Sequence, residues 1–157
     1  MARRKILIGY NGAPQGEDAL NLGLVLSQAL DALPELAVAV HYPHGDRGKS
    51  EAVTEFTENL FAEARKRAGD QELMEHAVVD ESPARALHAI AEELQPEMIV
   101  IGSAHHGPAG RILLGGVGET MLSGAPCAIA VAPLGYRERN QGIRRIGVAV
   151  DGSAQSL

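Results

Sequence analysis

The chain has 157 residues, 45% of them hydrophobic, with 14 Lys and Arg against 20 Asp and Glu. This length and composition indicate a globular domain with a sizeable core and exclude an intrinsically disordered chain. The formal net charge of −6 argues against a nucleic-acid backbone as partner. A single cysteine, Cys127, excludes an internal disulfide and favours a reducing compartment. No apolar run suits a membrane span or a signal-peptide core, so we expect a cytoplasmic protein.

Short apolar runs alternate with helical patterns along most of the chain. We predict strands at Lys5–Ile8, Leu36–Tyr42, His76–Val79, Met98–Ile101 and Cys127–Ala132. We predict helices from Glu17 to about Leu30, from Ser50 onward, from Ser82–Pro83 to Leu94, and after Gly116 to about Ser123. Pro34 is expected to break the first helix. Alternating strands and helices imply right-handed crossovers, so the predicted fold class is α/β, a doubly wound parallel sheet with helices on both faces.

A glycine-rich stretch follows the fourth predicted strand. Its glycines are Gly102, Gly107, Gly110, Gly115 and Gly116, and a helical pattern starts at Val117. A strand, a glycine-rich loop and a helix start bring bare backbone N–H groups to an anion, which predicts a phosphate-binding loop. The loop is not a P-loop, because no Gly-Lys-Ser or Gly-Lys-Thr follows it, and it lacks the Gly-x-Gly-x-x-Gly of dinucleotide-binding folds.

Residues for catalysis or for a resident metal do not form a recognisable pattern. The histidine pairs His105-His106 and His41 with His44 match no known metal-ligand spacing. Ser103 lacks the context of a nucleophile elbow, and the carboxylates are scattered. We therefore predict no catalytic residues, no metal site and no enzyme, with slow ATP hydrolysis left open.

The last part of the chain differs from the rest. Residues 134–144 are polar and predict a linker. Arg145–Ser156 then repeats the pattern of Lys5–Gly16, a basic residue and an apolar run followed by Asx-Gly-small-x-Gln-small. We expect residues 145–157 to be the first strand of a second domain of the same kind; the alternative is a chance strand and turn.

These features resemble the universal stress protein family. The resemblance rests on the run Leu36–His41, the Ile-Leu-Leu-Gly of 112–115 and the segment Ala125–Pro133. It covers Lys5–Pro133, which defines a domain at 1–133, and it restarts at Arg145. The resemblance implies an adenine nucleotide alpha hydrolase-like fold, a five-stranded parallel sheet in the order 3-2-1-4-5.

The resemblance also implies a nucleotide site. Its residues would be Asn11, Gly12, Tyr42, Gly102, His105, Gly115, Gly116 and Val117. Three of these depart from the family pattern. Asn11 replaces an aspartate and keeps an acceptor oxygen without the charge. His105 stands at the second glycine of the loop, and Gly116 stands where the family has Ser or Thr.

The function that the resemblance implies is a stress-response module that binds ATP or a related adenine nucleotide, with Mg²⁺ entering only beside the nucleotide. The alternative is a degenerate domain that binds no nucleotide and acts as a dimerisation or regulatory scaffold. The expected partner is a second copy of the chain, or the second tandem domain, joined through the last strand. Asp151-Gly152-Ser153 is the family's more usual form of the first-strand motif, which makes the first domain the more divergent one.

Overall fold

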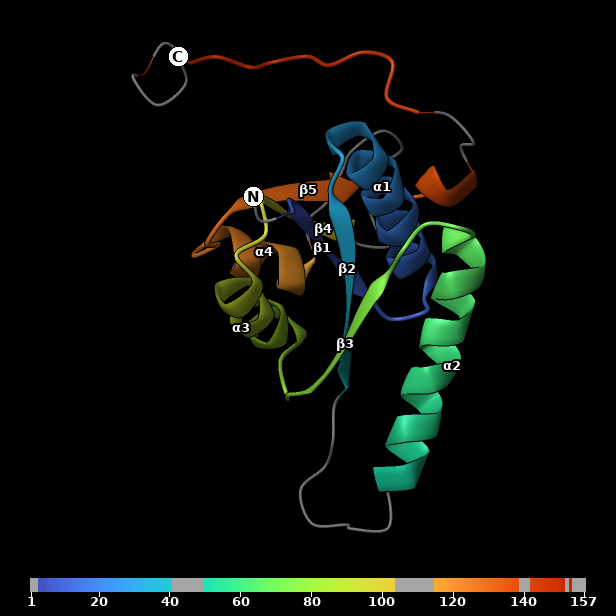
Figure 1. Ribbon diagram of the computed structural model, residues 1–157. Coiled ribbons are helices and arrows are strands. Elements are labelled where there is room, and N and C mark those ends of the chain that lie inside the picture. The colour runs from blue at the N-terminus through green and yellow to red at the C-terminus, as the bar shows by residue number, and fades with distance from the viewer. Residues whose placement is uncertain (1–2, 41–49, 104–114, 139–141, 152, 154–157) are drawn as a thin grey trace.

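The computed structural model describes residues 3–40, 50–103, 115–138, 142–151 and 153 (Figure 1). Strands and helices alternate along the chain as predicted. They are β1 (Lys5–Tyr10), α1 (Pro14–Leu30), β2 (Leu33–Val40), α2 (Ser50–Ala68), β3 (Met74–Val79), α3 (Pro83–Leu94), β4 (Met98–Gly102), α4 (Gly116–Leu122), β5 (Ala128–Ala132) and a 3-10 turn, η2 (Tyr136–Glu138).

The strands form one five-stranded sheet in the order β3-β2-β1-β4-β5, with every neighbouring pair parallel. This arrangement confirms the predicted doubly wound sheet and its strand order. The central strand, β1, pairs with β2 on one side and β4 on the other. The chain continues outward from β1 through β2 to β3, and from β4 to β5, so strand order reverses between β1 and β4. Ligand sites of doubly wound sheets lie at that reversal, beyond the carboxyl ends of the strands.

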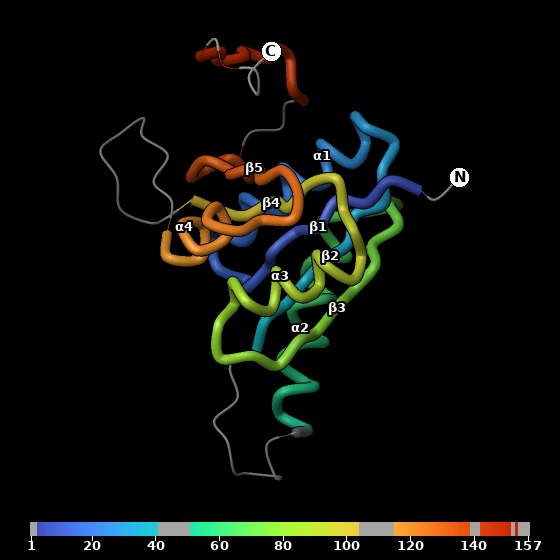
Figure 2. Tube along the Cα trace, turned by 90° about the vertical axis from the view of Figure 1, so that its left-hand side faces the viewer, coloured from blue at the N-terminus to red at the C-terminus, as the bar shows by residue number. Residues whose placement is uncertain are grey.

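Helices cover both faces of the sheet. In Figure 2, the view is from the side of α3 and α4, and α1 and α2 lie behind the sheet. Alternate residues of a strand pack into the helix layers on opposite faces of the sheet, because successive side chains of a strand point to opposite faces. Ile6 and Ile8 of β1 pack with α1 and α2, whereas Leu7 packs with α3 and α4.

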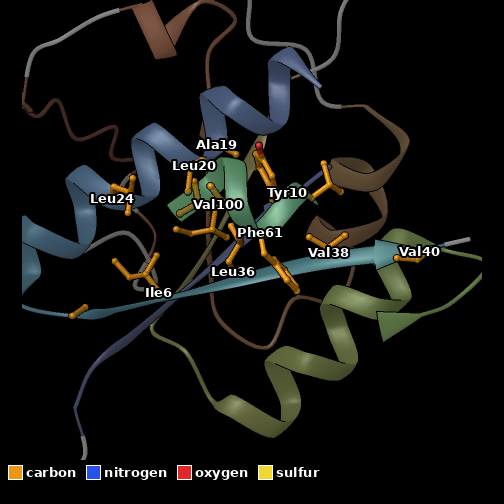
Figure 3. Close-up of a cluster of buried hydrophobic side chains, with 14 residues drawn as sticks. Ile6, Tyr10, Ala19, Leu20, Leu24, Leu36, Val38, Val40, Phe61 and Val100 are labelled. Atoms are coloured by element: carbon orange, nitrogen blue, oxygen red, sulfur yellow. The ribbon is translucent and has the colours of Figure 1, made fainter. Parts of the chain in front are cut away.

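Each layer has its own apolar core. The cluster under α1 and α2 includes Leu20, Leu36, Phe61 and Val100, all buried (Figure 3). On the opposite face, buried side chains of α3, α4 and β4 form the second cluster, against which the half-buried Cys127 packs. Burial raises the pKa of the Cys127 thiol.

The first helix ends at Leu30, as predicted, but begins three residues before the predicted Glu17. It starts at Pro14, which occupies the first helical turn, where its missing N–H costs no hydrogen bond. It ends because Asp31 adopts a left-handed conformation (φ 51°), and the amide of Ala32 then donates to the carbonyl of Ser27 at 2.9 Å.

The sequence suggested that Pro34 breaks the first helix, and this prediction is wrong, because Pro34 lies inside β2. The amide of Leu33 donates to the carbonyl of Arg4 in the direction of β1. The next amide position in a strand faces the other way, toward β3, whose pairing with β2 begins only at Glu35↔Met74. Proline therefore removes no hydrogen bond of the sheet at this position.

Residues 142–150 carry no helix or strand and are exposed; Ile146 and Val148 retain 83% and 80% of their accessible surface. A strand needs a hydrogen-bonded neighbour, and no described segment pairs with these residues. The strand expected at the start of a second domain therefore stays a prediction. Among the described helices, none has the length and apolar composition needed to cross a membrane.

Candidate functional site

A cavity of about 230 Å³ opens beyond the carboxyl ends of β1 and β4. Asn11 follows β1 on one side of it, and Gly102 ends β4 on the other. The start of α1, the start of α3 and the start of α4 complete the described walls. The cavity thus lies at the reversal of strand order, where the fold predicts a ligand site.

One part of the cavity is lined by small and apolar residues. Gly9 comes from β1, and Ala37 and Ala39 come from β2. Leu87 and Pro83 of α3 form the facing wall. A Cβ atom on Gly9 would lie 3.1 Å from a methyl carbon of Leu87, so the glycine lets α3 pack closely against β1. A lining of this kind suits the apolar part of a ligand.

Gly102 allows two backbone segments to approach closely. A Cβ atom at this position would lie 2.2 Å from the carbonyl oxygen of Gln15, in the first turn of α1. Close packing of β4 against α1 is therefore enough to explain why this position is a glycine, without any ligand. The next residue, Ser103, is buried and also lines the cavity, and its amide donates to the carbonyl of Ala132 at 3.0 Å.

Asn11 shapes the entry to α1. Its side-chain Oδ1 accepts a hydrogen bond from the amide of Ala13 at 3.1 Å. This bond satisfies one amide at the start of the helix in place of a conventional capping side chain. Gly12, also predicted as a site residue, does not line the cavity; it turns the chain with φ +70°, and a Cβ there would meet Leu60.

Backbone groups at the start of α4 line the opposite wall. Gly115, Gly116 and Val117, three of the residues predicted to bind a nucleotide, all border the cavity. The first hydrogen bond within the helix runs from the amide of Glu119 to the carbonyl of Gly115 at 2.9 Å. The amides of Gly116 and Val117 lie before this first bond, so they have no acceptor within the helix, as at the start of any helix. Gly116 is exposed, and a Cβ added to it would meet nothing within 4 Å.

The structure brings five of the eight predicted site residues together around one cavity: Asn11, Gly102, Gly115, Gly116 and Val117. Tyr42 and His105 lie outside the described residues. The sequence analysis missed the contributions of Gln15, the β2 alanines and α3, because a loop motif says nothing about small residues that look like ordinary core. Small residues at the carboxyl ends of neighbouring strands were the available signal.

A partly buried polar network lies next to the cavity. The hydroxyl of Tyr10, another lining residue, donates to a carboxylate oxygen of Glu17 at 2.5 Å, and the other oxygen pairs with Arg67 of α2. Burial, then the hydrogen bond to Glu17, holds the pKa of the Tyr10 phenol well above its usual value. The network joins β1, α1 and α2, so it fixes the end of β1 from which Asn11 extends.

The chain after β5 is fastened to the second turn of α1. Asp18 is completely buried and accepts hydrogen bonds from the amides of Gly135 at 2.9 Å and Arg137 at 2.7 Å. The Arg137 guanidinium adds contacts to the same carboxylate at 3.2 and 3.3 Å, and one to the carbonyl of Pro14 at 3.3 Å. Part of the segment predicted as a linker is thus docked beside the cavity-lining turn of α1.

The described lining residues offer hydrogen bonds and apolar contact. Neither a carboxylate nor a histidine nor a lysine is found among them, and their hydroxyl groups belong to Tyr10 and Ser103. In the part of the chain that the structure describes, no group of three or more His, Cys, Asp or Glu side chains is placed to hold a metal ion. The groups seen here can bind and orient a ligand of mixed apolar and polar character.

Comparison with known proteins agrees with this arrangement. Residues 2–133 match the sequence model of the Universal stress protein family. The chain belongs to the universal stress protein family. A universal stress protein of Mycobacterium tuberculosis is 24% identical over 163 residues, which cover 97% of this chain and 56% of the relative. The chain therefore spans little more than half the length of the curated relatives that it matches.

Solved universal stress proteins share the fold. One in complex with cAMP has a TM-score of 0.64 and 21% identity, covering 83% of this chain and 97% of that one. Another, from Archaeoglobus fulgidus in complex with dAMP, has a TM-score of 0.62 and 20% identity, covering 83% of this chain and 98% of that one. These likenesses establish the nucleotide-binding α/β fold of the family for this chain.

Proposed function

We propose that this universal stress protein domain binds an adenine nucleotide in the cavity between β1 and β4, as a stress-response module without strong catalysis. The observation that carries the proposal is the cavity itself. The β2 alanines and Leu87 line one space together with the polar Asn11 and the residues that begin α4. A nucleotide has the matching parts, a flat base and an anionic phosphate.

The solved relatives support the choice of base. Those structures are complexes with cAMP and with dAMP, and both ligands contain adenine. The number of phosphates is a separate question. Gly116 offers a backbone amide but no hydroxyl, and no lysine or arginine lines the described cavity. We therefore propose ATP, AMP and cAMP as the ligands to compare, with Mg²⁺ present for ATP.

Calorimetric titration with these three nucleotides tests the proposal. The decisive variant is Ala39→Ile, because Ala39 lines the cavity and a larger, branched side chain there takes up space that a ligand needs. Ala77→Ile is the matched control: it makes the same change on an exposed position of β3 that does not line the cavity. We expect the wild type and the control to bind with equal affinity and the Ala39 variant to lose binding. Failure of the wild type to bind any of the three would reject the proposal.

A second candidate is a scaffold that works by association. β5 is an edge strand of the sheet, and its Ile129 and Val131 are only half-buried. Apolar edges of this kind favour pairing with another strand. In this reading the partner is a second copy of the chain or the domain that we expect to start at Arg145. Light scattering of this chain, with and without nucleotide, discriminates the two: a nucleotide-independent dimer that fails to bind AMP or ATP supports the scaffold.

A further inference from the structure

The orientation of the Asn11 side chain determines what this residue can offer a ligand. The backbone N–H of Ala13 lies 3.1 Å from the side-chain atom that faces it. A backbone N–H only donates, so that atom must be the oxygen and the other end of the amide must be the NH₂ group. The oxygen that the sequence comparison offered as an acceptor is therefore already used within the protein.

Gly16 holds this orientation in place. A Cβ atom on Gly16 would lie 2.4 Å from Oδ1 of Asn11, so the oxygen occupies the space that the glycine leaves. Asn11 is exposed and lines the cavity, and its Nδ2 makes no hydrogen bond within the described residues. The group that remains for a ligand is a pair of N–H donors.

We propose that Asn11 is a specificity-determining residue that presents a hydrogen-bond donor, and selects a ligand with an acceptor atom at this point of the cavity. A ring nitrogen, a carbonyl oxygen or a sugar or phosphate oxygen satisfies it; a ligand amine or hydroxyl acting as donor does not. An aspartate in the same turn would present only an acceptor, so this single position reverses the polarity of the contact. The inference rests on the proposed function, since it concerns the same cavity.

The chain itself shows that an aspartate fits this turn. Asp151 ends the repeated apolar run, and its Oδ1 accepts a hydrogen bond from the amide of Ser153 at 2.8 Å. This is the same turn that Asn11 makes with Ala13. Asn11→Asp should therefore preserve the local fold and change only the group offered to the ligand, which makes it a clean test.

The experiment measures binding of adenosine and of AMP to the wild type, Asn11→Asp and Asn11→Ser by calorimetry, with thermal melting to verify folding. Adenosine carries no charge, so simple repulsion of a phosphate cannot explain an effect on it. Serine retains an acceptor for the Ala13 amide, but its single hydroxyl lies one bond closer to the backbone than Nδ2 and cannot place a donor where the NH₂ group stands. We therefore expect a loss of about two- to tenfold for both ligands. Aspartate opposes an acceptor with an acceptor, and we expect at least about a tenfold loss for adenosine.

Asn59→Asp is the matched control, because it adds the same charge on an exposed position of α2 outside the cavity lining, and its affinity should equal that of the wild type. Binding of adenosine by Asn11→Asp as tightly as by the wild type, or more tightly, would overturn this inference and leave the proposed function intact. Unchanged binding by Asn11→Ser would overturn it too. A wild type that binds neither adenosine nor AMP would reject the proposed function, and the role of Asn11 with it.

Discussion

Replacing Asp18 by asparagine tests whether the chain after β5 is an integral part of the domain. One oxygen of the buried carboxylate accepts the amide of Gly135, and the other accepts the amide of Arg137. Asparagine keeps one acceptor but directs an NH₂ group at the remaining amide. A hydrogen bond to a charged group contributes about 1.5–3 kcal/mol, and a buried donor left without a partner costs about 1–3 kcal/mol.

From these values we expect Asp18→Asn to lower the free energy of unfolding by about 3 kcal/mol. This value includes no contribution from the lost contacts of the Arg137 guanidinium. The Arg137 side chain is 25% exposed, so it can turn to water when the carboxylate is lost. For a domain of this size the loss corresponds to a fall in melting temperature of about 10 °C. Urea titration followed by circular dichroism gives the energy, and hydrogen exchange at the amide of Arg137 gives the local effect.

Two further proteins make the test specific. Arg137→Met keeps both backbone hydrogen bonds to Asp18 and should cost only about 1 kcal/mol. A chain shortened to end at Pro133 removes the partners that Asp18 has among the described residues, and it should be destabilised at least as much as Asp18→Asn. A chain that ends at Glu138 should match the full chain. An Asp18→Asn loss below about 1 kcal/mol, or an equal loss for Arg137→Met, would refute the reasoning.

Other predictions concern the walls of the cavity. Tyr10→Phe removes the hydroxyl that donates to Glu17, and should lower the free energy of unfolding by about 1–2 kcal/mol in urea titration. The pKa of Tyr10 is higher in the folded state than in the unfolded chain, so above about pH 10 the unfolded chain releases a proton that the folded protein keeps. The free energy of unfolding of the wild type should therefore fall as pH rises above about 10, and that of Tyr10→Phe should fall less. Gly102→Ala forces a Cβ toward the carbonyl oxygen of Gln15 and should cost about 2 kcal/mol or more in thermal melting, whereas Gly116→Ala meets nothing and should be neutral or slightly stabilising.

The sheet was predictable because its signal is local. Each buried strand is a short apolar run, each helix has an apolar stripe, and their alternation leaves few topologies for one domain. The errors at Pro34 and at the start of α1 arose where a residue's effect depends on its surroundings. Whether proline breaks a strand depends on which side of the strand is paired, and Pro14 can begin α1 because its missing N–H costs no hydrogen bond in the first helical turn.

The candidate site was predictable in its position and not in its chemistry. The glycine-rich stretch after β4 led to the correct end of the sheet, and Gly102 lies there. The sequence could not show that Gly102 is required by the backbone of Gln15, because that contact joins residues far apart in the chain. Nor could it show which end of the Asn11 amide faces the ligand, since the Ala13 amide decides that in three dimensions.

The first turns of α1 connect the cavity with the chain that leaves the domain. Gln15 lines the cavity, and Asp18, within one turn of the same helix, holds the segment after β5. The guanidinium of Arg137 also reaches the carbonyl of Pro14, where the helix begins. A helix transmits a shift at one turn to the next, because its hydrogen bonds link residues four apart. Ligand affinity measured on a chain without residues 135–137 would therefore describe a cavity with an altered wall, and the boundary chosen for binding experiments should lie after Glu138.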